Sequence, residues 1–125
     1  MPTVSMQVRG NNVLRRNLAK LRGRERLEAQ RRGLEAGARV VETWAKVNTT
    51  PNVDTGALRA SIMVDEVTPN EAIIAPHTDY AEHLEFGTVK MQAYPYMRPA
   101  LDEHEQEIIA AVGAQVEMFI DGVRA

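Results

Sequence analysis

An amphipathic stretch between Arg24 and Val47 places the strongest limit on how this chain can fold. Apolar or uncharged positions recur there at helical spacing, while Arg and Glu occupy most of the other positions. The positions of this face are Leu27, Gln30, Leu34, Ala38, Val41 and Ala45. A helix of this kind buries one stripe and exposes the other. The rest of the chain must therefore supply a surface that covers the stripe.

Two glycines, Gly33 and Gly37, lie within this amphipathic stretch. Glycine inside a helix costs about 1 kcal/mol of stability relative to alanine. Their lack of a side chain therefore indicates that another segment of backbone comes close to the helix at this point.

The helical spacing continues toward the N-terminus and predicts a helix that begins near Asn12. The apolar positions there are Val13, Leu14, Leu18 and Leu21. Either Asn11 or Asn12 can cap the first turn, because an Asn side chain accepts hydrogen bonds from the free N–H groups of a helix start. We therefore expect one long helix over residues 12–47, which Gly23 kinks or divides. Trp44, near its end, is expected to anchor the core.

The remaining segments predict a small sheet and a second helix. Residues 1–9 form a short strand or arm with alternating apolar side chains, and residues 61–75 form a β-hairpin that turns at residues 68–70. Residues 99–123 form a C-terminal helix, whose first turn is rich in acidic side chains that favour the positive end of the helix dipole. Its expected buried stripe is Leu101, Ile108, Val112, Val116, Phe119 and Val123.

These elements predict an α+β fold, with the long N-terminal helix and the C-terminal helix packed on a small antiparallel sheet. The length of 125 residues fits a single domain over 1–125. The hydrophobic fraction of 44% and the charged fraction of 26% are typical of a globular protein. Without cysteine, the chain has no disulfides or thiolate metal sites, which fits a reducing cytoplasm. We expect no signal peptide and no contact with a membrane.

The stretch from Asp79 to Leu101 holds four of the six aromatic residues of the chain. Residues 79–97 predict a short helix, which Gly87 ends, and then an aromatic loop. Aromatic side chains supply large contact areas, so this loop either packs on its own domain or contacts a neighbouring subunit. The candidate interface residues are Gly87, Thr88, Val89, Lys90, Met91, Gln92, Tyr94 and Tyr96.

Glu85 lies between Leu84 and Phe86, and these apolar neighbours indicate that it is at least partly buried. A buried carboxylate must find hydrogen-bond donors, because an unpaired buried charge is costly. Two arrangements are open. Glu85 can pair with Arg98, whose planar guanidinium suits a carboxylate. Alternatively, Glu85 accepts backbone N–H groups near Gly87 and Arg98 faces solvent.

Three motifs follow one another along the chain and read DTGALRASI, YAEHLEFGT and YPYMRPALDE. Together they resemble the tail-completion, or neck, proteins that join head and tail in long-tailed DNA bacteriophages. The matching positions are Asp54, Thr55, Gly56, Leu58, Ser61, Ile62, Tyr80, Ala81, Glu85, Phe86, Gly87, Thr88, Pro95, Arg98, Pro99 and Ala100. Tyr96 stands where a Phe is more usual in that family, so an aromatic residue is retained. The resemblance runs from the first helix to the C-terminus.

This resemblance implies a structural virion protein, made in the host cytoplasm, that forms a homo-oligomeric ring at the head–tail junction. Six copies are expected, to match the tail. The ring would bind the head connector or head-completion protein on one side and the tail-tube or tail-terminator protein on the other. The related tail-terminator role stays open. No catalytic residue, metal or cofactor is implied.

Charge is distributed unevenly along the chain. Residues 9–32 carry nine basic and two acidic side chains, a net charge of +7, whereas residues 65–107 carry ten acidic and two basic ones, a net charge of −8. This division permits head-to-tail contact between copies, or two solvated faces on one subunit. For the basic helix we favour arginines that pack their stems on the core and pair with acidic residues of the same or the next subunit. The division also permits contact with DNA phosphates, as in a small nucleic-acid-binding protein with a basic helix or in a channel through which DNA passes. The candidate basic face is Arg15, Arg16, Lys20, Arg22, Arg24, Arg26, Arg31 and Arg32.

Catalysis is the weakest of the functional hypotheses. Ser61 begins a predicted strand with no histidine near it in sequence, so a hydrogen bond to backbone is expected there. Asp79 and His83, or His104 and Glu107, could share a helix face, but neither pair matches a recognised metal signature. A hydrolase using Asp79, His83 or Glu85 is the remaining enzymatic alternative.

Overall fold

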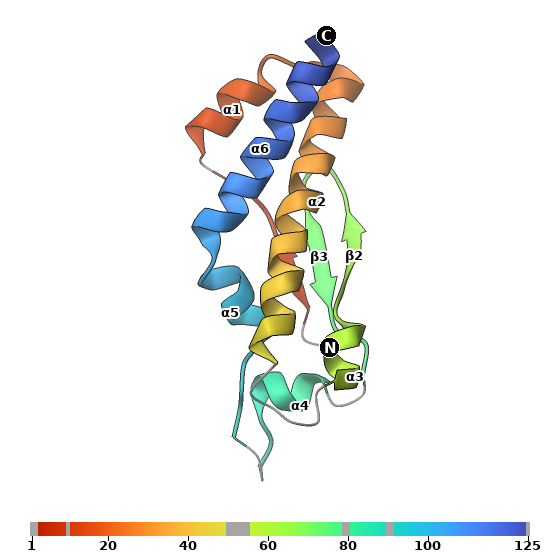
Figure 1. Ribbon diagram of the computed structural model, residues 1–125, viewed down its shortest axis with the longest axis vertical. Helices are drawn as coiled ribbons and strands as arrows, with labels where there is room; N and C mark the ends of the chain where they lie inside the picture. Colours follow the sequence, from red (N-terminus) through yellow and green to blue (C-terminus); the bar gives the residue numbers. More distant parts are fainter. Residues whose placement is uncertain (1–2, 10, 50–55, 79–80, 90–91, 125) are drawn as a thin grey trace.

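The computed structural model describes residues 3–9, 11–49, 56–78, 81–89 and 92–124 (Figure 1). It confirms the α+β fold. The strands are β1 (Val4–Met6), β2 (Met63–Val67) and β3 (Ala72–Ala75). The helices are α1 (Asn12–Leu18), α2 (Gly23–Asn48), α3 (Gly56–Ser61), α4 (Ala81–Phe86), α5 (Met97–Asp102) and α6 (Glu105–Arg124).

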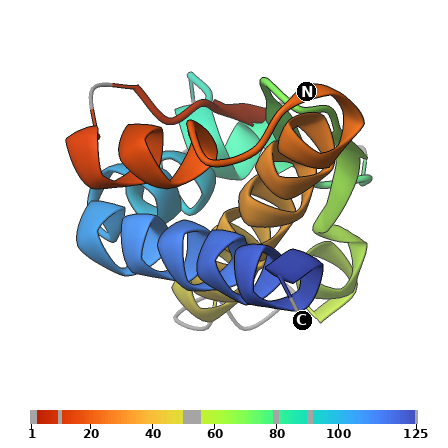
Figure 2. The ribbon, with the colours of Figure 1, turned by 90° about the horizontal axis from the view of Figure 1, so that it is seen from above.

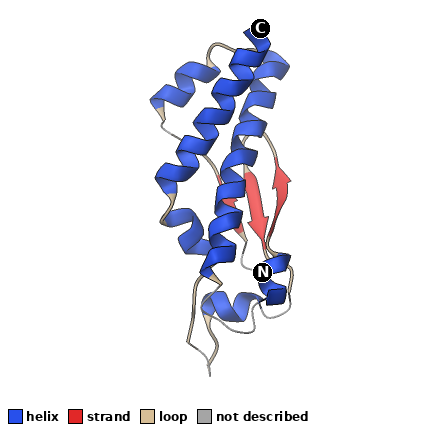
Figure 3. Ribbon diagram, in the orientation of Figure 1, coloured by secondary structure: helices blue, strands red, loops and turns tan. Residues whose placement is uncertain are grey.

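Helix α2 runs along the centre of an elongated molecule (Figures 1 and 3). It packs against α6 on one side and against the sheet on another. The two long helices run antiparallel, so the end of α6 lies beside the start of α2, together with α1 (Figures 1 and 2). Helix α4 and the segment that leads to α5 lie at the opposite end of the molecule.

The three strands form an antiparallel sheet in the order β1-β3-β2. Ile74 of the central strand is opposite both Val4 and Val64, and the β2–β3 register shifts between Val64 and Glu66. The alternation expected near the N-terminus is present, because Val4 and Met6 are buried while Ser5 is exposed. Glu42 of α2 accepts a hydrogen bond from the backbone N–H of Val64 at 3.1 Å. This contact connects the edge strand β2 to helix α2.

The helical region expected over residues 12–47 is divided into α1 and α2 at Gly23, so the division that the sequence left open is correct and a continuous, kinked helix is wrong. Asn11 caps α1 by accepting a hydrogen bond from the N–H of Leu14 at 2.9 Å. Tight turns then end α1, and Gly23 begins α2 with a φ of +57°, in the left-handed region that favours glycine. The break folds α1 back onto α6. Their shared cluster includes Leu14, Leu18, Leu21, Ala29, Val116, Phe119 and Ile120.

The single C-terminal helix expected over residues 99–123 is also divided. Helix α5 ends at Asp102, and α6 begins at Glu105. Between them, the ring of His104 stacks on the indole of Trp44, with the ring centroids 3.9 Å apart and the planes at 7°. The buried stripe of α6 follows a spacing of four residues and ends at Ile120, whereas Val123 is exposed. Its members are Ile108, Val112, Val116 and Ile120.

The buried face of α2 matches the expected one from Leu34 onward and differs before it. Leu34, Ala38, Val41 and Ala45 are buried, but Leu27 is 50% exposed and Ala29 is buried in its place. The face therefore rotates toward α6 at its N-terminal end, where α1 and α6 supply the cover.

Gly33 and Gly37 lie where α2 and α6 approach closely, as expected from their lack of side chains. A Cβ atom at Gly37 would stand 2.8 Å from a γ-methyl of Val112 and 3.0 Å from the ε-methyl of Met6. At Gly33 it would stand 3.0 Å from a γ-methyl of Val116. At both positions, any residue larger than glycine would therefore push against α6.

We predict that Gly37→Ala destabilises the protein by about 1–3 kcal/mol, because overpacking of a filled core outweighs the gain in helix propensity. The matched control is Gly113→Ala on α6, where a new Cβ meets nothing within 4 Å. We expect that change to stabilise by about 0.5–1 kcal/mol. Urea unfolding followed by circular dichroism measures both, and equal effects would contradict the close approach of the two helices.

Candidate assembly surface

The carboxylate of Glu85 organises the end of the molecule that carries α4 and the start of α5. One of its oxygens accepts hydrogen bonds from the backbone N–H groups of Tyr96 at 2.9 Å and Met97 at 2.8 Å. The other accepts from the N–H of Arg98 at 3.3 Å. Glu85 is buried, and these N–H groups belong to the first turn of α5. The carboxylate thus caps α5 from the neighbouring helix.

The expected pairing of Glu85 with the Arg98 side chain is wrong. The guanidinium of Arg98 is exposed and contacts Asp102 at 3.2 Å, one turn further along the chain. The alternative is correct in that Glu85 accepts backbone N–H groups. However, those groups lie at Tyr96 to Arg98 and not near Gly87.

Further hydrogen bonds hold the segment between α4 and α5 at its two ends. The N–H of Gly87 donates to the carbonyl of His83 at 2.8 Å, and Gly87 has a φ of +75° at the end of α4. The N–H of Tyr94 donates to the carbonyl of Leu84, also at 2.8 Å. The hydroxyl of Tyr96 donates to the carbonyl of Ala81 at 2.9 Å. The segment is therefore fixed where it leaves α4 and where it returns to α5.

Three apolar side chains stand exposed on this fixed base, and we call them the apolar tip: Phe86, Val89 and Tyr94. Phe86 is 69% exposed, Tyr94 is 53% exposed and Val89 is fully exposed. Thr88 and Gln92, also interface candidates, are exposed beside them. Tyr96 is completely buried and belongs to the core. The interface candidates Lys90 and Met91 lie outside the described residues.

Phe86 belongs to the family motif and is not among the interface candidates that the sequence predicts. Its sequence position nevertheless carries the relevant signal. Ala81, Leu84 and Glu85 are buried at helical spacing, which places the next residue on the other face of α4.

The other motif residues fall into three groups. Leu58 is completely buried, Pro99 is half-buried, and Gly56 and Pro95 are exposed. Ser61 bonds backbone as expected: its hydroxyl donates to the carbonyl of Leu58 at 2.7 Å and accepts from the N–H of His77 at 3.0 Å. The motif positions Asp54, Thr55 and Tyr80, and the candidate Asp79, lie outside the described residues.

The histidines lie on separate parts of the surface. His77 contacts Asp65 at 2.8 Å, His83 is exposed on α4, and His104 lies 4.0 Å from Glu107. Glu107 also accepts a hydrogen bond from the indole N–H of Trp44 at 2.8 Å. Trp44 is half-buried, and it therefore connects α2 to the start of α6 through its contacts with His104 and Glu107. Over the described ranges, no cluster of three or more potential metal ligands is present.

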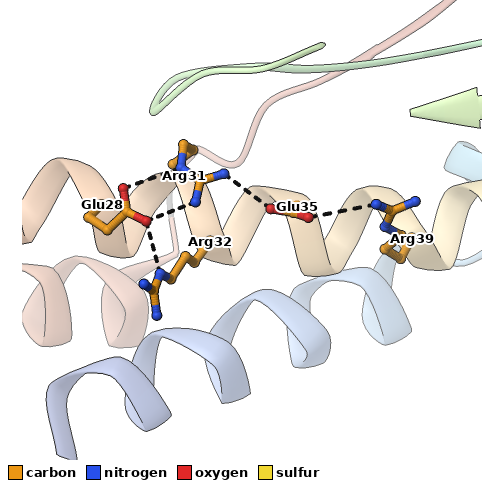
Figure 4. Close-up of polar contacts among 5 residues, drawn as sticks. All are labelled: Glu28, Arg31, Arg32, Glu35 and Arg39. Carbon is orange, nitrogen blue, oxygen red and sulfur yellow. Dashed lines mark hydrogen bonds and ion pairs between the residues drawn. The ribbon is translucent and has the colours of Figure 1, made fainter. Parts of the chain in front are cut away.

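The basic residues divide into two groups that the sequence does not distinguish. Arg31 and Arg32 form part of an ion-pair ladder along α2, in which both guanidiniums hold Glu28, at 2.8 and 2.9 Å (Figure 4). Glu35 continues the ladder to Arg31 at 3.1 Å and to Arg39 at 3.7 Å. Hydrogen bonds from Arg31 and Arg32 lower the pKa of the Glu28 carboxyl to about 2. The same contact with Glu28 raises the pKa of Arg31.

The second group forms what we call the basic corner, which spans α1, the connection and the start of α2. Its residues are Arg15, Arg16, Lys20, Arg22, Arg24 and Arg26. All of them are exposed, and none has an ion-pair partner within the described parts of the chain. The basic corner and the apolar tip lie at opposite ends of the molecule (Figure 1).

The comparison with protein families identifies the class of protein. Residues 12–87 match the family described as "Bacteriophage HK97-gp10, putative tail-component". This match covers more than half of the chain, from α1 to the end of α4, and the chain belongs to this family. It is thus a structural, virion-associated component of a bacteriophage tail. Comparisons with curated proteins and with solved structures gave no significant match.

We predict that Glu85→Ala destabilises the protein by about 2–4 kcal/mol, because it leaves backbone N–H groups of α5 without acceptors. Arg98→Ala should cost less than about 0.5 kcal/mol, since exposed ion pairs contribute little. The two effects should add within about 0.5 kcal/mol in the double variant, because the two side chains do not pair. Urea unfolding measures all three, and strong non-additivity would restore the Glu85–Arg98 pairing.

We predict that the Glu28 carboxyl titrates near its lowered pKa of about 2 in the folded protein. Since the folded pKa lies below the ordinary value of 4.5, the ladder stabilises fully above about pH 4.5 and is lost as the pH falls through about 2. Carboxyl NMR titration checks this value. Arg32→Gln should raise it, whereas the distant change Arg98→Gln should not. A Glu28 midpoint near 4.5 would contradict the ladder.

Proposed function

We propose that this tail component is a neck or tail-completion protein that forms a homo-oligomeric ring at the head–tail junction. Six copies are expected, to match the tail. One side of the ring would bind the head connector or head-completion protein, and the other the tail tube or tail terminator. The protein would act by complementary packing, without catalytic turnover. Of its described helices, none is long and apolar enough to cross a membrane.

The observation that carries the proposal is the apolar tip. Large apolar side chains exposed together on a monomer are typical of protein–protein contact sites. Aromatic residues are enriched among those that dominate binding energy. Here Phe86 and Tyr94 stand on a base that Glu85 fixes by three backbone hydrogen bonds. A contact on a fixed base loses little conformational entropy on assembly, which favours binding.

The elongated shape supports contact with two partners. The apolar tip lies at one end, and the basic corner lies at the other, beside the end of α6 (Figures 1 and 2). A subunit that joins two structures must present distinct surfaces to each of them. The two ends of the molecule differ in exposed apolar side chains and in charge, and this difference meets that requirement.

We predict that the double variant Phe86→Ser/Tyr94→Ser folds normally and fails to join heads to tails. Each aromatic side chain at the centre of an interface contributes about 2 kcal/mol, so each loss weakens the contact by about 30-fold. The measurement is complementation in trans of a phage that lacks this gene, scored by infectious titre and by electron microscopy for unjoined heads and tails.

The matched control is Met63→Ser/Met118→Ser, which removes two exposed apolar side chains from β2 and α6. It should leave the titre unchanged. A wild-type titre for the aromatic double variant would exclude the apolar tip as an assembly contact. Absence of the protein from purified wild-type particles would overturn the ring proposal itself.

A further inference from the structure

The basic corner is a dense group of charges that the fold leaves uncompensated. Residues 15–26 carry six basic side chains and a single acidic one, Glu25, for a net charge of +5. The six cations come from α1, from the connection and from the first turn of α2. These segments lie together at one end of the molecule (Figure 2). The charges repel one another, so they weaken the isolated fold at this end.

The same helix shows how the chain neutralises arginines elsewhere. Arg31, Arg32 and Arg39 each contact a carboxylate one turn away on α2. The three arginines before them, Arg22, Arg24 and Arg26, lie near the positive end of the α2 dipole, which favours anions and disfavours cations. Cations at these positions therefore do not stabilise the fold by themselves. An external anion that binds them would stabilise it.

A second copy of this chain is a poor source of that anion, because most described carboxylates in its acidic half already have partners. Asp65 contacts His77, Asp102 contacts Arg98, and Glu85 holds the start of α5. Glu71 accepts a hydrogen bond from Ser5, and Glu107 accepts one from Trp44. Within the described part of this half, Glu66, Glu103 and Glu105 remain without a side-chain partner, and elsewhere in the described ranges Glu25, Glu117 and Asp121 do so too. These residues are scattered over α2, β2, the α5–α6 junction and α6, so they do not form one acidic surface that matches the basic corner.

We propose that the basic corner binds the phosphate backbone of double-stranded DNA, without reading its sequence. A polyanion offers many phosphates at regular spacing, and it gains from the release of its condensed counterions when cations replace them. Exposed arginines and lysines on adjoining helices suit such contacts, which position a protein on DNA without specifying bases. The proposal goes beyond assembly into a ring and does not depend on it.

The test is fluorescence anisotropy of the full-length protein with a labelled duplex of about 30 base pairs, over a range of salt concentrations. About four phosphate contacts predict a slope of about −3.6 in log affinity against log salt, and a loss of about 10²-fold between about 50 and 200 mM salt. The triple variant R22Q/R24Q/R26Q should reduce the slope by about 2–3 and weaken binding at low salt by at least about tenfold.

Two controls make the result specific to the basic corner. R39Q/K46Q/R98Q removes the same net charge from the other parts of α2 and from α5, and it should bind DNA almost as the wild type does. R22K/R24K/R26K keeps the charge and should also retain binding, since a lysine contacts phosphate as a point charge.

Three outcomes would overturn the proposal. Wild-type protein that does not bind DNA at low salt would do so. So would equal losses in the two glutamine triples, which would indicate a non-specific effect of net charge. The third is self-association of the wild type at low salt that R22Q/R24Q/R26Q abolishes, without any DNA binding. That result, measured by analytical ultracentrifugation, would assign the basic corner to a contact between copies.

Discussion

The close contact between α2 and α6 at Gly33 and Gly37 is the constraint on which the rest of the structure depends. The γ-methyl groups of Val112 and Val116 occupy the space that side chains at these positions would need. Because the two helices run antiparallel, the start of α2 lies beside the end of α6. Helix α1 covers the apolar side chains at that end. At the other end, the same alignment brings His104 onto Trp44 and sets the position of α5.

The position of α5 in turn determines what Glu85 can do. Its carboxylate is buried, and burial without donors would cost several kcal/mol. The first turn of α5 supplies three N–H groups at the right place, so the cost is offset and α4 is joined to α5. The apolar tip is thus a consequence of core packing far from it, transmitted through α5 and one buried carboxylate.

Periodicity in the sequence predicts the parts of this arrangement that local patterns control. The buried face of α2 from Leu34 to Ala45, the Asn11 cap and the hairpin all follow from spacing and turn residues. At Gly23 the sequence leaves a kink and a break open, because glycine permits both, and only the cover that α1 gives to α6 makes the break favourable. The sequence also leaves two arrangements open for Glu85, namely pairing with Arg98 and acceptance of backbone N–H groups. The choice depends on N–H groups eleven to thirteen residues later, which local sequence cannot place.

The sequence is equally limited in predicting which charges stay unpaired, because a count of basic residues does not distinguish Arg24 from Arg31. Glu28 lies four residues after Arg24 and could pair with it, yet its oxygens are taken by Arg31 and Arg32. An acidic residue placed before its basic partner on a helix is the more favourable order, since it agrees with the helix dipole. Both contacts of Glu28 have this order, which directs its carboxylate away from Arg24 and leaves the basic corner unneutralised, although Arg31 and Glu35 pair in the reverse order. The charge that remains available to a partner is set by which pairs the helix has already formed, and not by the composition of the segment.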